Sequence, residues 1–188
     1  MTEAEFAALV LHNPVNAAIL QRLPSFGFQD WWLVSGCLFQ TVWNIRTGQD
    51  VQHGIRDYDL FYFDPDISYD AEDAVIRHVR KACADVSAAI EVRNQARVHL
   101  WYGEKFGTAY PPLNRASDGI DRFLMPCAQV GIRVRDKSYD IYAPAGFDDL
   151  ANMIVRPNRM PNFQAERYDA KAARWKALWP QLTVLPAC

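Results

Sequence analysis

The chain lacks the marks of a membrane or secreted protein. No apolar run is long enough to cross a bilayer, and the acidic, amphipathic N-terminus has no signal-peptide layout. The cysteines form no Cys-X-X-Cys pair and show no metal spacing; they are Cys37, Cys83, Cys127 and Cys188. We therefore expect a cytoplasmic protein without a membrane partner, whose thiols are reduced and mostly buried.

The chain also has little net charge. Its formal charge at pH 7 is −2, which does not favour general attraction to nucleic acids or membranes. A nucleic-acid partner would therefore have to bind locally. Internal repeats and low-complexity linkers are absent, and 188 residues of which 50% are hydrophobic suit one domain with a real core. We expect residues 1–188 to form one domain, with 156–188 as a C-terminal helical extension, and the sequence indicates no oligomeric state.

What is present is a pair of acids at the start of an apolar segment. In residues 56–64, Asp57 and Asp59 open a run of aromatic and aliphatic residues that is typical of a buried strand. Alternation along a strand places both acids on the face of Phe61 and Phe63. Neighbouring carboxylates repel each other unless a cation lies between them, and Mg²⁺ prefers such oxygen ligands. The alternative is a solvated strand end with two ordinary acids.

A second informative stretch lies upstream. Residues 31–34 predict an apolar strand that ends at Ser35 and Gly36, and residues 38–45 predict a helix. A glycine at a strand-to-helix junction lets the backbone approach a ligand, and the helix N-terminus offers free N–H groups and the positive end of a dipole. The order of the two stretches predicts a phosphate-binding site at Ser35, Gly36 and Cys37, followed by a metal-binding site at Asp57 and Asp59.

These two motifs resemble the signature of the polymerase-β-type nucleotidyltransferase superfamily. With the segments 94–102 and 142–144, they are similar to a family of bacterial nucleotidyltransferase-like proteins of about this length. The resemblance implies an α/β (α+β) fold with a mixed β-sheet flanked by helices. It also implies a nucleoside triphosphate substrate, Mg²⁺ or Mn²⁺, and transfer of a nucleoside monophosphate to an unidentified hydroxyl acceptor with release of pyrophosphate.

The resemblance also implies roles for particular residues. Asp57 and Asp59 would hold two metal ions that clamp the attacking and leaving oxygens of an in-line displacement. The superfamily has a third carboxylate on a later strand, for which we favour Glu91, with Asp140 as the rival. Glu91 would complete the metal site and accept the proton of the acceptor. The triphosphate would be seated on Ser35 and on the backbone of the two residues that follow it.

Residues 90–100 predict a strand with one polar face. That face carries Glu91, Arg93, Gln95, Arg97 and His99. Arg93 and Arg97 are the cations that we expect to bind the nucleotide. Any half-exposed strand shows the same alternation, and a strand that ends early would remove His99 from this face.

The remaining segments give a coarse outline. Helices within residues 3–23 are broken at Asn13-Pro14, and residues 103–121 form a long loop. The segments 127–134 and 139–142 form a hairpin with a turn at Asp136-Lys137. A short helix at 147–154 and a last helix at 162–178 follow. The last helix carries a basic stripe, Arg167, Lys171 and Arg174, for which a solvated face is the more frequent cause than phosphate or RNA binding.

Two departures from the superfamily pattern keep other functions open. No hydroxyl residue follows Gly36, and no Lys or Arg follows closely in the helix, so the predicted phosphate-binding site is short of donors. A non-catalytic nucleotide-binding or regulatory module of the same fold is the second hypothesis. The third is a glycosyltransferase that uses Asp-X-Asp for a sugar nucleotide. It is disfavoured because in those enzymes the apolar strand precedes the acidic pair, whereas here it follows.

Overall fold

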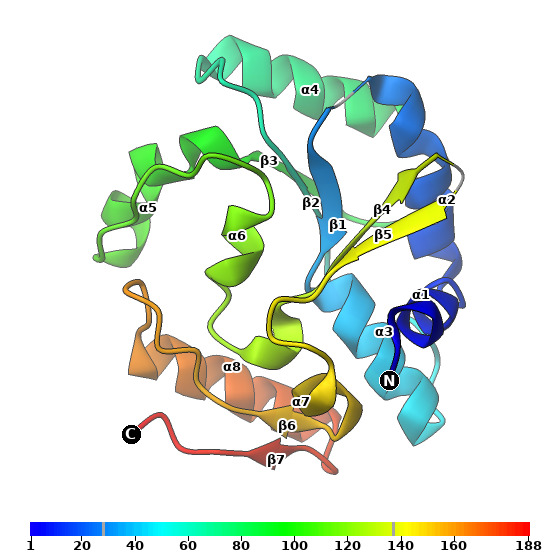
Figure 1. The fold of residues 1–188 in the computed structure, drawn as a ribbon, viewed down its shortest axis with the longest axis vertical. Coiled ribbons are helices and arrows are strands. Elements are labelled where there is room, and N and C mark those ends of the chain that lie inside the picture. Colours follow the sequence, from blue (N-terminus) through cyan, green and yellow to red (C-terminus); the bar gives the residue numbers. More distant parts are fainter. Residues whose placement is uncertain (28, 137) are drawn as a thin grey trace.

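A mixed sheet of five strands forms the centre of the computed structural model, which describes residues 1–27, 29–136 and 138–188. The strand order is β3-β2-β1-β4-β5 (Figure 1). The strands are β1 Trp31–Val34, β2 Tyr58–Tyr62, β3 Ile90–Asn94, β4 Gly131–Arg135 and β5 Ser138–Tyr142. β2 and β3 are parallel, and the other neighbouring pairs are antiparallel. This arrangement confirms the predicted α+β class with a mixed sheet.

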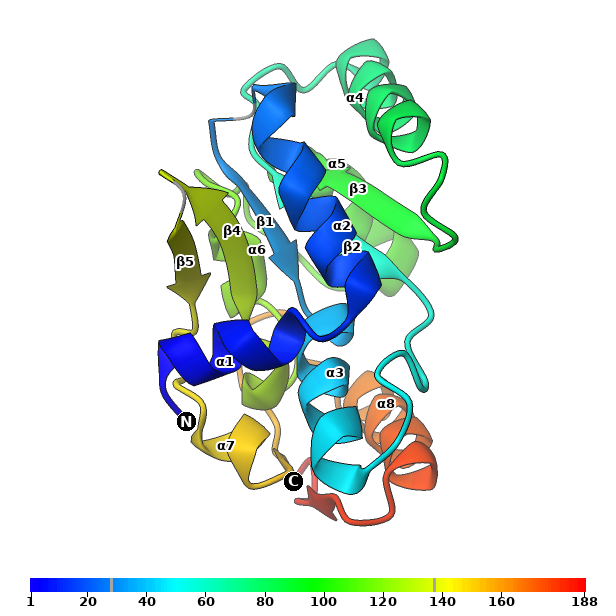
Figure 2. The same cartoon turned by 90° about the vertical axis from the view of Figure 1, so that its right-hand side faces the viewer.

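Three helices cover one face of the sheet, where Leu33 and Leu60 are fully buried. They are α1 Glu3–Val10, α2 Pro14–Arg22 and α3 Gly36–Thr47. The predicted break between the first two is confirmed, because the Asn13 side chain accepts a hydrogen bond from the Val15 N–H at 3.0 Å and Pro14 takes the first helical position. Figure 2 shows α2 lying across β1 and β2.

The parallel pair is joined by α4 Tyr69–Ala82, a crossover helix that Ser68 caps at its N-terminus. β3 then ends at Asn94, six residues earlier than the sequence predicts. The Asn94 side chain accepts hydrogen bonds from the N–H groups of Ala96 and Asp64, each at 3.1 Å. These bonds turn the chain into a 3₁₀ segment, Gln95–Arg97, and then into α5 Val98–Phe106. The strand prediction for residues 95–100 is therefore wrong.

Smaller differences follow toward the C-terminus. The predicted loop at 103–121 contains the end of α5 and a short helix, α6 Asp118–Asp121. The hairpin is confirmed, but its first strand begins only at Gly131, because residues 126–128 form a 3₁₀ turn. The turn was predicted at Asp136-Lys137, and Lys137 lies outside the described residues. The helix predicted at 147–154 is shorter in the structure, where α7 spans Asp148–Ala151.

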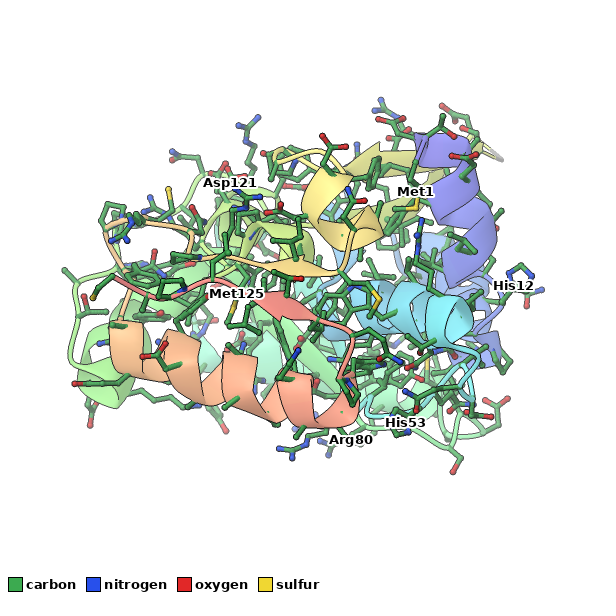
Figure 3. The ribbon with its side chains drawn as sticks, turned by 90° about the horizontal axis from the view of Figure 1, so that it is seen from below. Met1, His12, His53, Arg80, Asp121 and Met125 are labelled. Carbon is green, nitrogen blue, oxygen red and sulfur yellow. The ribbon has the colours of Figure 1, made fainter. Side chains whose placement is uncertain are left out.

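The C-terminal segment packs on the same core as the rest of the chain. It contains α8 Ala165–Leu178 and β7 Thr183–Val184, which pairs in parallel with β6 Ile154–Val155. Figure 3 shows α8 and the β6–β7 pair beside α3. Trp43 of α3 has its ring centre 5.7 Å from that of Trp175. We therefore propose that residues 156–188 fold together with the rest. Within the described residues, no helix is long and apolar enough to span a membrane.

Candidate active site

The predicted carboxylates meet on the face of the sheet opposite α1, α2 and α3. Asp59 of β2 lies in register with Glu91 of β3, and paired residues on parallel strands present their side chains to the same face. Burial first, and then the charges of Asp57 and Glu91, raise the pKa of the Asp59 carboxyl to about 7. The charges of Asp57 and Glu91 therefore act on Asp59 at the start of β2 and β3.

Glu91 is turned toward a cation of its own strand. Its Oε2 atom lies 3.2 Å from an Nη atom of Arg93, and both side chains are exposed. In the part of the chain that the structure describes, no three His, Cys, Asp or Glu side chains lie close enough together to hold a metal ion. The oxygen donors themselves suit Mg²⁺ or Mn²⁺. Burial first, and the charges of Asp57 and Glu91 second, disfavour a bare charge on Asp59, so these carboxylates would suit a divalent cation if Glu91 turned away from Arg93.

Asp140, the rival third carboxylate, lies elsewhere. It stands on β5, three strands from β2, which is about 14 Å at ~4.8 Å per strand. Its carboxylate accepts a hydrogen bond from Nε of Arg133 at 3.1 Å and forms an ion pair with the same side chain. Asp140 is thus occupied with Arg133 and does not join Asp57 and Asp59.

The predicted phosphate turn lies directly beside the aspartates. Val34, the last residue of β1, is in register with Asp59, so α3 begins next to the acidic pair. Ser35 turns the chain there with φ 62° and ψ −126°, a sparsely populated region that costs about 1–3 kcal/mol. Burial raises the pKa of the Cys37 thiol well above its usual range, as do the charges of Asp59 and Asp57. The Cys37 thiol is therefore neutral and fully buried in the core beside the aspartates.

The basic stripe of α8 faces these carboxylates and not solvent alone. Burial lowers the pKa of the Lys171 ammonium, and the charge of Asp59 raises it, which places Lys171 near that carboxylate. Burial and the charge of Arg56 lower the pKa of the Arg174 guanidinium, and the charge of Asp57 raises it, which places Arg174 near Asp57. Lys171 is thus largely withdrawn from solvent, unlike a residue of a solvated face, and Arg174 is half-buried.

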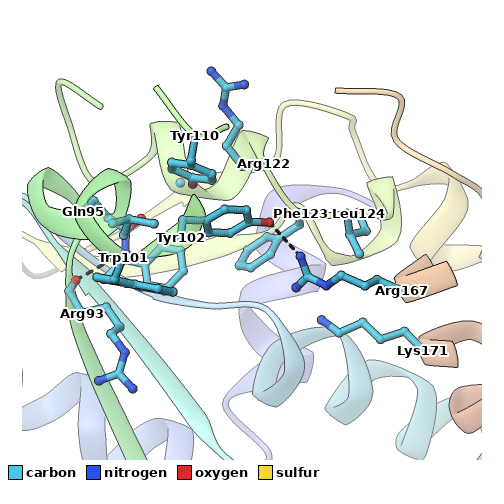
Figure 4. A pocket seen from close by; sticks show the side chains of 13 residues that line it. Arg93, Gln95, Trp101, Tyr102, Tyr110, Arg122, Phe123, Leu124, Arg167 and Lys171 are labelled. Atoms are coloured by element: carbon cyan, nitrogen blue, oxygen red, sulfur yellow. Dashed lines mark hydrogen bonds between the residues drawn. The ribbon is translucent and has the colours of Figure 1, made fainter. Parts of the chain in front are cut away.

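A cavity of about 160 Å³ opens beside the carboxylates. It starts at Phe61 and Arg93, each two residues along its strand from Asp59 and Glu91, and runs between α5, α6 and α8. Figure 4 shows Arg167 and Lys171 extending from α8 toward Tyr102. Other residues that line it include Gln95, Trp101, Tyr110 and Arg122. Aromatic rings and cations therefore line a cavity that begins two residues along β2 and β3 from Asp59 and Glu91.

The contacts inside this cavity hold its walls in place. The ring centres of Tyr102 and Tyr110 are 4.3 Å apart. The Tyr102 hydroxyl accepts a hydrogen bond from Arg167 at 2.9 Å, and the guanidinium of Arg167 lies 3.7 Å from the ring centre of Phe106. These interactions join α5, the loop after it and α8 into one wall.

With this geometry in place, the profile of a protein family described as "Nucleotidyltransferase" matches residues 21–184. The chain belongs to this family. A protein whose NMR structure is described as revealing a CCA-adding enzyme head domain superposes with a TM-score of 0.78 at 22% sequence identity. The match covers 98% of this chain and 96% of that one, and it shows a shared nucleotidyltransferase fold. No curated protein matches the chain.

Not every residue expected in the nucleotidyltransferase site is brought to it. Arg97 forms an ion pair with Glu72 of α4, with Nε 2.8 Å from Oε2, and also contacts the Ile67 carbonyl oxygen. The 3₁₀ turn after Asn94 directs Arg97 to the α4 side, so it lies apart from the carboxylates. Arg93, still on β3, lines the cavity.

Several residues that line the cavity were not predicted as site residues. Trp101 and Tyr102 lie in the segment 94–102 that carries the family resemblance but were given no role, and Arg122 gave no signal, because the proximity of the three depends on how α5 and α6 fold back over the sheet. The length of the loop after α5 was the one hint, since it contains Tyr110.

Proposed function

We propose that this nucleotidyltransferase is a metal-dependent enzyme that moves a nucleoside monophosphate from a nucleoside triphosphate to a hydroxyl acceptor. The observation that carries the proposal is the register of Asp59 with Glu91 on one face of the sheet, next to the N-terminus of α3. A third carboxylate beside an acidic pair is what activation of an acceptor requires, beyond simple nucleotide binding.

The carboxylates of Asp57, Asp59 and Glu91 would hold Mg²⁺ or Mn²⁺. Divalent ions in this place would stabilise the attacking and leaving oxygens of an in-line displacement. Ser35 and the backbone of Gly36 and Cys37 would receive the triphosphate at the helix N-terminus. Lys171 and Arg174 would add the positive charge that α3 does not supply near its start.

In the transfer itself, the acceptor oxygen bonds to the α-phosphorus while the bond from the α-phosphorus to its bridging oxygen breaks. The acceptor proton passes to the Glu91 carboxylate, and pyrophosphate leaves. Glu91 must first leave Arg93, which it contacts at 3.2 Å. Arg93 is then available to a phosphate group, as is the ammonium of Lys171.

The cavity offers stacking faces and cations to a nucleotide. Tyr102 and Trp101 suit a ring system, and Arg122 and Arg167 suit phosphate or polar ring atoms. A structurally similar protein is described as a CCA-adding enzyme head domain, so an RNA end is one candidate acceptor. A small alcohol, an antibiotic or a protein hydroxyl equally fits a chain of net charge −2.

The test has two stages. A thermal-shift screen of the four nucleoside triphosphates with Mg²⁺ should find at least one that stabilises the protein, since ligand at about 100 times its Kd adds ~2.7 kcal/mol. Glu91→Gln should then keep that binding and lose most pyrophosphate release in the presence of an acceptor, whereas Glu166→Gln, on the exposed side of α8, keeps both.

Each stage can refute a part of the proposal. If no triphosphate stabilises the protein, the nucleotide-binding role is wrong. If a triphosphate binds but neither the parent nor any variant releases pyrophosphate with any acceptor class, the chain is the non-catalytic module. Full turnover in Glu91→Gln would remove Glu91 from the mechanism.

A further inference from the structure

Gln40 is a buried polar residue whose side-chain amide makes no hydrogen bond among the described residues. It lies on the second turn of α3, in a helix that begins at Gly36, and only 6% of it is exposed. Its Oε1 atom is fully enclosed without a hydrogen-bond partner, and no bond of its Nε2 atom is found among the described residues. Buried side-chain amides are usually hydrogen-bonded, and the Nε2 donor of Gln40 is the group that an oxygen of a ligand can satisfy.

The amide of Gln40 is aimed at the start of its own helix. Its Nε2 atom lies 3.1 Å from the point that a Cβ atom on Gly36 would occupy. Side chains four residues apart lie one above the other on a helix, and in this pair the glycine leaves the space below the amide open. Gly36 is only half-buried, and Val34, two residues before it, is in register with Asp59, so this space lies near the acidic pair.

Other donors converge on the same place. The Ser35 N–H donates to the Val130 carbonyl oxygen at 3.1 Å, whereas the N–H groups of Gly36 and Cys37 have no backbone acceptor within the described part of the chain, and that of Cys37 contacts its own thiol. Two backbone N–H groups without a carbonyl partner and the Gln40 amide therefore lie at the first turn of α3. Such a group of donors suits a doubly or triply charged oxyanion.

We propose that Gln40 donates a hydrogen bond from Nε2 to the triphosphate of the bound nucleotide. The inference rests on the proposed function, because it places the triphosphate at the N-terminus of α3. It also explains how this chain manages without a hydroxyl residue after Gly36 and without a cation in the next turn: the donor comes from the side chain four residues on.

The test compares Gln40→Met with the parent. Methionine keeps the length and apolar contacts of glutamine and removes both hydrogen-bonding groups. The matched control is Gln49→Met, just beyond the other end of α3, where the amide donates to the Leu178 carbonyl oxygen. Calorimetry with Mg²⁺ measures the Kd of inorganic tripolyphosphate and of each nucleoside triphosphate. Thermal unfolding without ligand measures the Tm of each protein.

We expect Gln40→Met to bind tripolyphosphate and triphosphates about tenfold to a hundredfold more weakly, by the same factor for both, because the lost bond is to phosphate and not to the base. Its Tm without ligand should equal or exceed that of the parent, since an unpaired buried amide is removed. Gln49→Met should keep the Kd of the parent. If Gln40→Met does not fold, Gln40→Glu has the same shape, lacks the donor, and should show at least as large a loss.

The outcomes separate the two proposals. A parent that binds triphosphate while Gln40→Met binds it within twofold overturns the role of Gln40 and leaves the proposed function standing. A parent that binds no triphosphate overturns the proposed function, and the role of Gln40 with it.

Discussion

Asp59 is held in the folded protein at a cost that grows with pH. Burial, and then Asp57 and Glu91, raise the pKa of its carboxyl from 3.8 to about 7. Because the folded pKa lies above the unfolded one, the folded state binds more protons between about pH 4 and pH 7. The free energy of unfolding therefore falls as the pH rises through that window. A shift of about three pKa units at ~1.36 kcal/mol each gives about 4 kcal/mol, and contact with solvent reduces this to about 2–4 kcal/mol.

Asp59→Asn removes the charge and keeps the shape. In metal-free protein, the variant should be more stable than the parent by about 2–4 kcal/mol at pH 8. At pH 4 it should gain less than about 1 kcal/mol, because the folded parent already carries the proton there. Urea unfolding in EDTA at the two pH values measures both numbers, with an unchanged m-value as the sign that only stability has moved.

The matched control is Asp66→Asn. Asp66 is exposed, and a hydrogen bond from the Ser68 backbone N–H lowers the pKa of its carboxyl, so the same substitution should bring no gain at pH 8. If Asp59→Asn is no more stable than the parent at pH 8, the three carboxylates do not strain one another, and the geometric argument for a cation site loses its support.

Three further substitutions test the rest of the site. Asp57→Asn should fold normally and lose the extra stabilisation that Mg²⁺ adds to triphosphate binding in thermal shift, while Asp140→Asn keeps it; equal Mg²⁺ dependence in both would contradict the metal assignment. Gly36→Ala should change the free energy of unfolding by less than about 1 kcal/mol, because the φ of Gly36 is ordinary and the atom nearest to the new Cβ belongs to the flexible Gln40 side chain. The same substitution should weaken triphosphate binding in calorimetry; an unchanged affinity would show that the turn is only structural. Arg167→Met removes the hydrogen bond to Tyr102 and a cation beside the acids, and should weaken nucleotide binding about tenfold; an unchanged Kd would exclude the cavity from the site.

The local features of this protein were predictable from its sequence. Asn13 followed by proline predicted the break between α1 and α2, and the alternation after Asp57 predicted which side chains share a face of β2. The turn at Ser35 and Gly36 was likewise placed correctly between β1 and α3. Each of these follows from backbone preferences of a few consecutive residues, which do not depend on the rest of the fold.

The end of β3 was not predictable in this way. The polar and apolar residues continue to alternate from Glu91 to His99, as in a strand, but the chain turns at Asn94 and then becomes helical. That turn depends on hydrogen bonds between the Asn94 side chain and the Asp64 backbone, and on a bond that the Asn94 N–H donates to the Glu72 carboxylate. These bonds join segments 22 or more residues apart. A local period carries no information about such partners.

Which of Glu91 and Asp140 lies beside Asp59, and what the α8 stripe faces, were decided by the tertiary structure alone. Both acids lie within segments whose sequences predict strands, but the sheet order puts β3 beside β2 and leaves β5 three strands away from β2. The spacing of Arg167, Lys171 and Arg174 shows that they share a side of a helix, but not what that side meets. Packing of Trp175 against Phe39 and Trp43 turns the helix toward the aspartates. Chain sequence sets the period of a segment, whereas the neighbours of that segment are set by which apolar surfaces bury one another.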